Sequence, residues 1–330
     1  MVSVIIPVYQ VSDYVERCIR SVMAQTFTDI ECIIVDDATK DDGIVKCERL
    51  IETYVGPINF RIVRHEENRG LSAARNTGTK LVNGVYIYYL DSDDDMTPDC
   101  LELLVREAQE HPDAEMVVGN TQVLRNEKPE RVWIKEDTPT LVRQNGTIAE
   151  YYHLRLIPNA AWNKLIKRSF IEAHGLYFKE GLIHEDILWM FYVVKYVSVV
   201  VLVKKITNYY HIRPGSISTS TDENTEGINY SVVYDDILHH LTLGREKKEL
   251  NFYVNDFCKC YLRHKATIPS YEGVHKLYRE NAWKYGCWSV YLILVTIRII
   301  GYFGNPSGIL ECLNALRWKW KRMTISVKTI

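Results

Sequence analysis

Short apolar runs alternate with amphipathic stretches along the first 120 residues. The apolar runs are rich in Val, Ile and Tyr and have the length of strands, whereas the stretches between them repeat apolar positions at helical spacing. The predicted strands are residues 2–8, 30–35, 60–63, 85–90 and 115–119, and the predicted helices are residues 15–23, 44–54, 73–81 and 101–110. This alternation predicts an α/β fold with a mainly parallel sheet and helices on both faces.

The pattern changes further along the chain. Residues 121–160 are more polar and are predicted to be a loop or excursion, followed by a helix at 187–195 and a strand at 197–203. After about residue 220 the pattern is helical and no further strand–helix alternation appears. We therefore expect an α/β domain over residues 1–220 and a helical C-terminal region over residues 221–330.

Composition narrows the class of protein. The 330 residues are 47% hydrophobic and 25% charged, which excludes collagen-like, low-complexity and wholly disordered chains. The net charge of −2 gives no support for bulk nucleic-acid binding. It conceals an asymmetry, however, because residues 281–330 hold seven Lys or Arg and one acid, leaving 33 basic and 41 acidic residues before them. A basic tail on an acidic body suggests an interaction segment.

Cysteine usage and the N-terminus bear on the compartment. The eight cysteines form no CxxC pair, and Cys258-Lys-Cys260 lacks a second ligand cluster, so we expect free thiols in a reducing compartment. The first residues have no basic segment, and their apolar run is too short for a signal peptide. A cytoplasmic protein is expected.

Carboxylates follow two of the predicted strands. Asp36 and Asp37 end the second strand, and the fourth ends in a run from Asp91 to Asp95. Ligands of such sheets bind beyond the carboxyl ends of the strands, and clustered carboxylates with oxygen-only ligands suit Mg²⁺ or Mn²⁺. The alternative is an acidic turn exposed to solvent, with Asp94 or Asp95 capping a helix that starts near Pro98.

A glycine and a helix start lie between these acidic strand ends. Gly70 is followed by a predicted helix with Arg75 one turn in, which suits a cation placed near phosphate. A surface salt bridge is the alternative for Arg75.

Five segments together resemble the ordered motif series of family 2 glycosyltransferases, which have the GT-A fold. They are residues 3–9 (SVIIPVY), 18–27 (CIRSVMAQTF), 33–37 (IIVDD), 68–76 (NRGLSAARN) and 89–94 (YLDSDD). Each motif is weak alone, but the order and spacing are specific. The resemblance covers about the first 120 residues.

The resemblance implies a site for a nucleotide-sugar, with a UDP-sugar as the leading donor class. Pro7, Tyr9 and Asp37, with Asp36 beside them, match the positions that hold the base and ribose. Asp91-Ser92-Asp93 matches the Asp-x-Asp element that meets ribose and a divalent cation, Mn²⁺ or Mg²⁺, with Asp93 as the direct ligand. Gln10 departs from the family, which usually has Asn there.

A looser resemblance extends into the later half. Residues 162–165 (WNKL) resemble a Trp-x-Lys-Leu element of bacterial members, which assigns Lys164 to the donor site. Residues 181–186 (GLIHED) resemble their Glu-Asp motif, which implies Asp186 as general base and Glu185 in reserve. Without the resemblance, Glu185 and Asp186 read as the acidic first turn of a helix.

The segment at residues 209–217 (YYHIRPGSI) resembles the end of the family's catalytic domain. His211 stands where the family usually has Arg, so it could approach the diphosphate or the metal, and Arg213 could bind phosphate. Both could equally be ordinary loop residues.

The resemblance implies an inverting glycosyltransferase that moves a hexosyl or N-acetylhexosaminyl group to a hydroxyl on a growing glycan or lipid-linked saccharide. Two other classes stay open: a nucleotidyltransferase, although no Gly-rich, Lys-bearing loop directly follows the first strand, and a non-catalytic sugar-nucleotide or membrane-binding protein.

The C-terminal region carries a candidate membrane surface. Residues 289–303 form an apolar run too short for a spanning helix, and residues 316–323 interleave Trp with Lys and Arg. This composition suits an anionic membrane surface, so we expect peripheral attachment to the inner face of the cell membrane. A buried helix with a solvated basic end is the alternative.

Overall fold

The computed structural model describes residues 1–240 apart from 214 and 217–220. The chain divides into two compact units, Met1–Ser220 and Thr221–Ile330. The described part of the second unit is helix α9 (Glu223–His240), whose start is capped where Thr225 N–H donates to Asp222 Oδ1 at 3.0 Å. The predictions for residues 289–303 and 316–323 lie outside the described residues.

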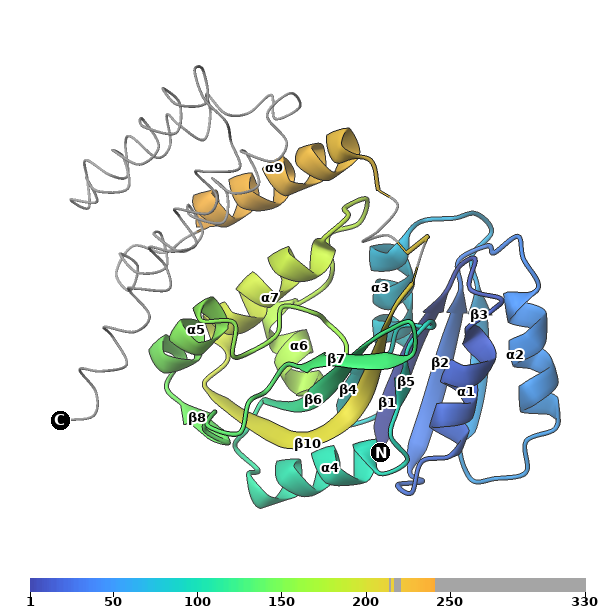
Figure 1. The fold of residues 1–330 in the computed structure, drawn as a ribbon, viewed down its shortest axis with the longest axis horizontal. Helices are drawn as coiled ribbons and strands as arrows, with labels where there is room; N and C mark the ends of the chain where they lie inside the picture. Colours follow the sequence, from blue (N-terminus) through green and yellow to red (C-terminus); the bar gives the residue numbers. More distant parts are fainter. Residues whose placement is uncertain (214, 217–220, 241–330) are drawn as a thin grey trace. The chain divides into compact units, whose positions relative to one another are not determined.

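The first unit is built on one sheet with the strand order β3-β2-β1-β4-β9-β6-β10-β5, with β7 paired to β6 and β8 to β10 (Figure 1). Its N-terminal half is parallel: β1 lies between β2 and β4, and β2 pairs with β3. These strands are β1 (Val2–Val8), β2 (Ile30–Asp36), β3 (Asn59–Arg64) and β4 (Tyr86–Tyr89). The second half mixes parallel and antiparallel pairs. The predicted α/β fold with a mostly parallel central sheet is confirmed.

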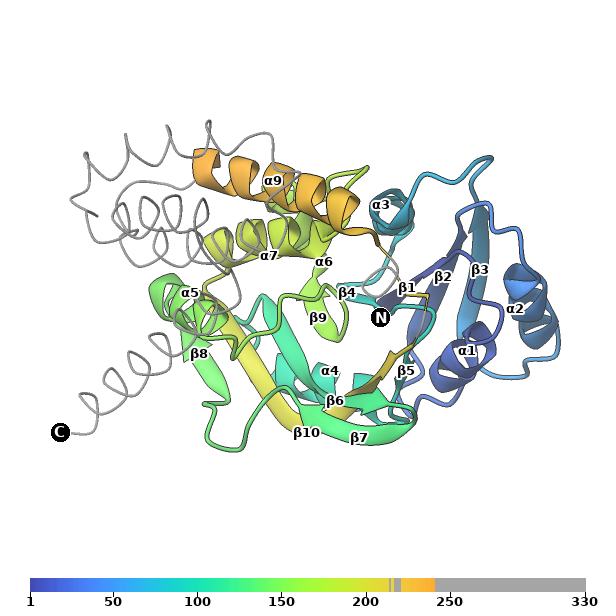
Figure 2. The same ribbon diagram turned by 45° about the horizontal axis from the view of Figure 1, so that its top comes forward.

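Helices cover both faces of the parallel half because β1 is apolar on both sides. Val4 and Ile6 belong to one buried cluster with Cys18 and Val22 of α1, whereas Ile5 faces α3, where only a glycine, Gly78, leaves it room. Figure 2 shows α1 and α2 on one side of these strands and α3 on the other. The helices are α1 (Val15–Met23), α2 (Gly43–Glu52), α3 (Leu71–Leu81) and α4 (Cys100–Glu110).

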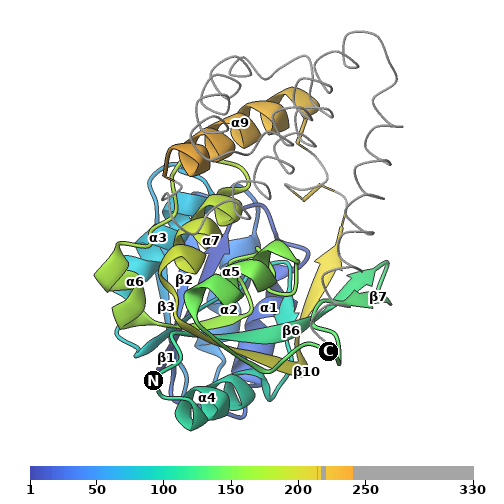
Figure 3. The ribbon, with the colours of Figure 1, turned by 90° about the vertical axis from the view of Figure 1, so that its left-hand side faces the viewer.

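The second half of the sheet is covered in the same way. Figures 1 and 3 show α4 on one side of β6 and β10, and α5, α6 and α7 on the other. These elements are β5 (Asp95–Met96), β6 (Met116–Arg125), β7 (Lys128–Val132), β8 (Leu141–Arg143), α5 (Asn145–His153), β9 (Lys164–Lys167), α6 (Arg168–His174), α7 (Glu185–Tyr196) and β10 (Val199–Ile212).

The prediction of a loop over residues 121–160 is wrong in part. Strand β6 continues to Arg125 because β10 and β7 pair with it on either side, and α5 follows. Asn126 and Glu127 have φ of 51° and 58° and form the two-residue turn between β6 and β7. All five residues of β7 are exposed, so this edge strand carries no apolar signal.

The topology brings the carboxyl ends of β1, β2 and β4 to the same edge of the sheet. Within the described part of the chain, no helix combines the length and the apolar character that a membrane span requires.

Candidate functional site

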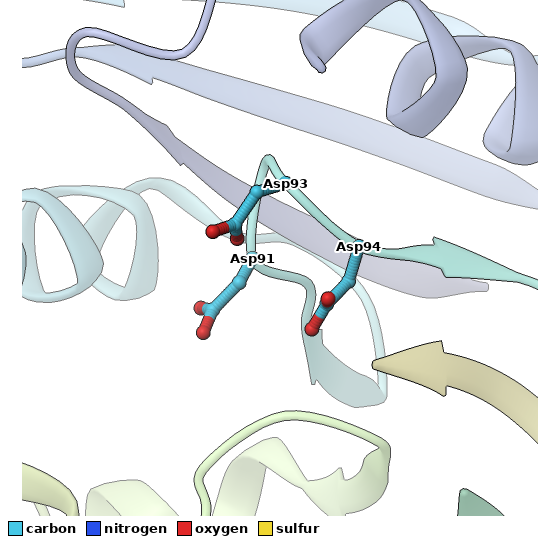
Figure 4. Close-up of side chains that lie close together, drawn as sticks. All are labelled: Asp91, Asp93 and Asp94. Carbon is cyan, nitrogen blue, oxygen red and sulfur yellow. The ribbon is translucent and has the colours of Figure 1, made fainter. Parts of the chain in front are cut away.

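Three carboxylates gather in the turn that follows β4. Asp91, Asp93 and Asp94 each offer an oxygen, and these oxygens lie within 4.8 Å of one another (Figure 4). The turn is closed by a backbone hydrogen bond from Asp94 N–H to Asp91 O at 3.1 Å. It is the only such group of metal-binding side chains among the residues that the structure describes.

The electrostatics of this turn favour a cation. Burial and the neighbouring Asp91 carboxylate raise the pKa of Asp93, and burial with the charges of Asp93 and Asp91 raises the pKa of Asp94 well above its usual value. Asp94 is fully buried, and its Oδ2 has no hydrogen-bond partner within the described residues. A buried, unpartnered carboxylate oxygen next to two further carboxylates fits a divalent cation with oxygen ligands.

The alternative role of Asp94 and Asp95 as helix caps is wrong. Helix α4 begins at Cys100 with Asp99 before it, so neither residue adjoins the helix. Asp94 Oδ1 instead accepts a hydrogen bond from the backbone N–H of His211 at 2.9 Å, and Asp95 Oδ1 lies 2.6 Å from His211 Nε2. Strand β10 thus holds the acidic turn from one side.

His211 and Arg213 lie at the end of β10, near the acidic turn. Besides Asp95, the His211 imidazole contacts Glu127 Oε1 through Nδ1 at 3.2 Å, so both ring nitrogens are engaged and the ring is outside the three-carboxylate group. Arg213 donates from Nε to Asp93 Oδ2 at 2.8 Å, and its guanidinium lies 4.5 Å from the centre of the Tyr14 ring. The predicted metal contact of His211 would therefore require it to leave Asp95.

The acids after β2 organise the backbone around them. Asp37 is buried and accepts hydrogen bonds from the N–H groups of Arg69 at 2.9 Å and Gly70 at 2.7 Å, and its Oδ1 lies 2.6 Å from His65 Nδ1. Gly70 has φ of 85°, a backbone conformation that favours glycine, directly before α3. Asp37 thus fixes the start of α3.

Asp36, Pro7, Tyr9 and Ser92 complete the predicted donor-binding set. Asp36 is buried and accepts a hydrogen bond from Thr39 N–H at 2.9 Å. Pro7 is buried within β1, Ser92 is buried in the acidic turn, and Tyr9, just beyond β1, is 38% exposed. Tyr9 is the member of this set whose ring is open to a ligand.

The predicted general base lies at the start of α7. Glu185 and Asp186 form its acidic first turn, directly after His184, which has a left-handed backbone with φ of 64°. Asp186 is partly exposed. Burial of its carboxyl group and the adjacent Glu185 raise the pKa of Asp186 to about 7, although Arg75 opposes the shift. Glu185 and Asp186 therefore form the acidic first turn of a helix, and this position is compatible with the predicted role of Asp186 as general base.

Arg75 links the first turn of α7 to the acidic turn at residues 91–94. It is 2% exposed, and it donates from Nη1 to Glu185 Oε1 at 2.5 Å and from Nη2 to Asp91 Oδ1 at 2.6 Å. Burial alone would lower the pKa of Arg75, but the Asp91 and Glu185 carboxylates outweigh it and raise the pKa. The surface salt bridge considered for Arg75 is wrong, because the ion pairs are buried.

Lys164 is also buried, at 1% exposure. Its ammonium donates to the backbone oxygen of Ala160 and lies 3.5 Å from that of Trp162, so in this structure it holds the turn that leads into β9. Burial lowers the pKa of Lys164 to about 7, partly offset by the charge of Asp186.

The sequence gives two residues of the site no specific role there. Asp94 belongs to the run of carboxylates from Asp91 to Asp95, but the only individual role that the sequence suggests for it is a helix cap. Phe178, whose ring lies 5.2 Å from the Arg75 guanidinium, precedes the Glu-Asp turn in a segment without a recognisable pattern. No sequence signal predicts that contact.

Comparison with known proteins identifies the family. The profile of glycosyl transferase family 2 matches residues 3–175. Glycosyltransferase GlyA of Streptococcus pneumoniae is 32% identical over 230 residues, covering 66% of this chain and 31% of GlyA. Putative glycosyltransferase EpsH of Bacillus subtilis is 33% identical, covering 54% of this chain and 50% of EpsH. The chain thus spans 31% of the length of GlyA and half of the length of EpsH.

Solved structures share the fold at low sequence identity. S. aureus TarS 1-349 in complex with UDP-GlcNAc has a TM-score of 0.64 at 18% identity, covering 79% of this chain and 72% of that one. The mannosyltransferase PcManGT from Pyrobaculum calidifontis, in complex with GDP-Man and Mn²⁺, has a TM-score of 0.55 at 14% identity, covering 96% and 79%. With the profile match over more than half of its length, this chain belongs to glycosyl transferase family 2 and has a GT-A-like fold.

Proposed function

We propose that residues 1–220 are the catalytic domain of an inverting glycosyltransferase and residues 221–330 a helical C-terminal region. The domain would move a hexosyl or N-acetylhexosaminyl group from a nucleotide-sugar to an acceptor hydroxyl. The observation that carries this proposal is the contact of one buried guanidinium, Arg75, with both Asp91 and Glu185. It brings the acidic turn, suited to a cation and diphosphate, next to the turn that bears a candidate base.

A UDP-sugar is the proposed donor, since TarS, a structural neighbour, binds UDP-GlcNAc. The exposed ring of Tyr9 would contact the base, and Asp36 and Asp37 lie at the adjacent strand end. A growing glycan or lipid-linked saccharide is the proposed acceptor, as in bacterial glycan biosynthesis.

The acidic turn would hold Mn²⁺ or Mg²⁺ through Asp93, with Asp91 and Asp94. We propose Asp94 in place of His211 as the third ligand, because Asp94 Oδ2 has no partner in the described residues whereas His211 is engaged by Asp95 and Glu127. The bound cation supplies positive charge to the departing diphosphate. Arg213, beside Asp93, is placed to bind a phosphate oxygen.

The chemical step is a single displacement. The acceptor oxygen forms a bond to the anomeric carbon while the bond from that carbon to the phosphate oxygen breaks, and the electron pair leaves with the nucleoside diphosphate. Asp186 takes the proton of the acceptor hydroxyl. A carboxyl group with a pKa of about 7 suits this role, because its ionised form is present near neutral pH and is still basic enough to accept a proton.

A donor screen tests the proposal. UDP-sugars and GDP-sugars are supplied with Mn²⁺ or Mg²⁺, and release of nucleoside diphosphate is measured with and without lipid-linked acceptors. Asp93→Ala should abolish metal-dependent turnover, and Asp186→Asn should abolish turnover while UDP still binds. Asp113→Asn, in an exposed ion pair with Arg143, is the matched control.

Three outcomes would contradict the proposal. Release of pyrophosphate instead of nucleoside diphosphate would indicate a nucleotidyltransferase. Donor binding without any turnover would indicate a non-catalytic sugar-nucleotide protein. Wild-type activity in both Asp93→Ala and Asp186→Asn would remove the assigned roles of these two carboxylates.

A further inference from the structure

The guanidinium of Arg75 occupies a closed site between two turns that are far apart in the sequence. Its Nη1 donates to Glu185 Oε1 at 2.5 Å and its Nη2 to Asp91 Oδ1 at 2.6 Å. Its Nε has no hydrogen-bond partner in the described part of the chain, so the two Nη groups make all the polar side-chain contacts that the structure shows for Arg75.

Aromatic side chains line the site of the Arg75 guanidinium. The Phe178 ring, 5.2 Å from the Arg75 guanidinium, stacks on Trp189 of α7 with ring centroids 4.8 Å apart and an angle of 14°. Tyr89 of β4 meets both rings edge-on, at 5.3 and 5.8 Å. The Tyr89 hydroxyl is in turn 2.8 Å from Thr79 Oγ1, and Thr79 lies one turn after Arg75 in α3. Packing therefore fixes the direction in which Arg75 points.

This placement has a geometric consequence. Asp91 begins the acidic turn, and Glu185 is covalently joined to Asp186, so one rigid guanidinium sets the distance between the proposed metal site and the proposed base. We infer that Arg75 is a positioning residue that aligns Asp186 with the acidic turn, and that it is not a ligand of the donor diphosphate. This inference rests on the proposed function.

The chemistry of the side chain explains why arginine is needed. A guanidinium is planar and can donate to two carboxylates from two separate nitrogens at once, whereas a lysine ammonium is a single point charge on a flexible stem. Arg75→Lys keeps the positive charge but cannot keep both contacts in the same geometry. The distance between the two turns would then no longer be fixed.

The test compares binding with turnover in Arg75→Lys. UDP binding in the presence of Mn²⁺ is measured by calorimetry, and kcat and donor KM are measured with the donor that the screen identifies. We expect kcat to fall about a hundredfold, since small misplacements of reacting groups have effects of this size, while UDP affinity and donor KM change by less than about threefold. Arg143→Lys, the same change in an exposed ion pair with Asp113, should leave all three values unchanged.

The opposite pattern would overturn the inference. A loss of UDP affinity of tenfold or more in Arg75→Lys would make Arg75 a diphosphate ligand, and an unchanged kcat would show that the alignment does not matter. If Arg75→Lys does not fold, as judged by its thermal transition, Glu185→Asp is used, because it keeps the charge but shortens the side chain by one methylene, so that the carboxylate can reach Arg75 Nη1 only if the turn moves. It should lower kcat and leave UDP affinity and donor KM unchanged, and an unchanged kcat would again count against the inference.

Failure of the proposed function gives a separate result. If wild-type protein turns over no donor in the screen, the glycosyltransferase assignment fails. UDP and Mn²⁺ binding to Arg75→Lys still decides whether the Arg75 guanidinium contacts the diphosphate.

Discussion

At the scale of single residues, the protonation of Asp186 is the most accessible test of the site. Burial and Glu185 raise the pKa of Asp186 to about 7, and only the ionised carboxylate can accept a proton from the acceptor. We expect kcat/KM to fall about tenfold for each pH unit below 7 and to level off above it. A pH–rate profile measures this. An acid limb near pH 4 would show that Asp186 is not the base.

The raised pKa of Asp186 also predicts how the stability of the protein changes with pH. Asp186 has a folded-state pKa of about 7, above the value of about 4 for an unfolded aspartate, so the folded state binds more protons between these values. The contribution of Asp186 to stability is therefore present at low pH and is lost as the pH rises toward 7. Asp186→Asn should remove this part of the pH dependence in urea unfolding curves. An identical pH dependence in the two proteins would contradict the shift.

Asp94 tests the cation site without any donor. Because burial and the neighbouring carboxylates raise the pKa of Asp94, its charge costs stability when no cation is bound. Asp94→Asn keeps an oxygen for the His211 N–H, so we expect a higher Tm without metal. Mn²⁺ affinity should fall at least about tenfold, or about 1.4 kcal/mol.

The control for Asp94→Asn is Asp99→Asn. The Asp99 carboxylate pairs with Lys205 and lies outside the group of Asp91, Asp93 and Asp94. Thermal shifts with and without Mn²⁺, together with calorimetry, give both quantities. An Asp94→Asn protein with wild-type Mn²⁺ affinity would remove Asp94 from the proposed ligand set.

At the scale of elements, the apolar pattern predicted the buried strands and the helices that bury one face. Strands β1 and β2 are almost wholly buried, so their Val and Ile runs are unambiguous, and α1 buries one face. The pattern failed at β7, which is exposed along its length, and at β5, which has two residues. Both are defined by pairing with distant strands, which a local pattern does not contain.

The sequence likewise predicted some features of the candidate site and missed others. The motif series assigned Asp91 and Asp93 to the candidate site, and the looser resemblance of residues 181–186 assigned Asp186, because each of these residues follows or starts a recognisable element. Neither resemblance revealed that Arg75 contacts the Glu185 carboxylate, since that contact depends on tertiary packing, in which Phe178 lies against both the Arg75 guanidinium and Trp189 of α7. Contacts made by tertiary packing could not be derived from local sequence.

A buried hydrogen-bond network where β6, the start of β9 and β10 meet predicts the effect of a substitution at Gly119. A Cβ on Gly119 would collide with Thr207 Oγ1 and Asn163 Oδ1, which are 2.9 Å apart in a hydrogen bond. Asn163 Nδ2 also donates to Asn120 O at 3.1 Å, so the network has little freedom to move. Gly119→Ala should destabilise the protein by about 1–3 kcal/mol.

The matched control is Gly146→Ala in α5, where a Cβ meets nothing within 4 Å. Alanine favours a helix over glycine, so stability should stay the same or rise by up to about 1 kcal/mol. Urea unfolding of both variants measures the difference. Equal stabilities of the two variants would mean that the network around Gly119 adapts to a methyl group.

At the scale of the whole molecule, charge is distributed unevenly along the sequence. Residues 281–330 carry seven Lys or Arg and one acid, whereas the chain before them has 33 basic and 41 acidic residues. The net charge of residues 1–280 does not favour an anionic surface, whereas that of residues 281–330 does. We propose peripheral attachment to the inner face of the cell membrane through this basic segment, which would place the catalytic domain beside a lipid-linked acceptor.

The full-length chain should therefore sediment with vesicles that contain phosphatidylserine and not with vesicles of phosphatidylcholine alone. Each Lys or Arg near an anionic surface contributes about 1 kcal/mol. Replacing Arg317, Lys319, Lys321 and Arg322 with Gln should weaken binding by about 4 kcal/mol, roughly a thousandfold, while keeping Trp318 and Trp320. Added salt should weaken wild-type binding, because ions screen these charges. Equal binding of the wild-type and substituted chains would show that the basic segment does not attach the protein to lipid.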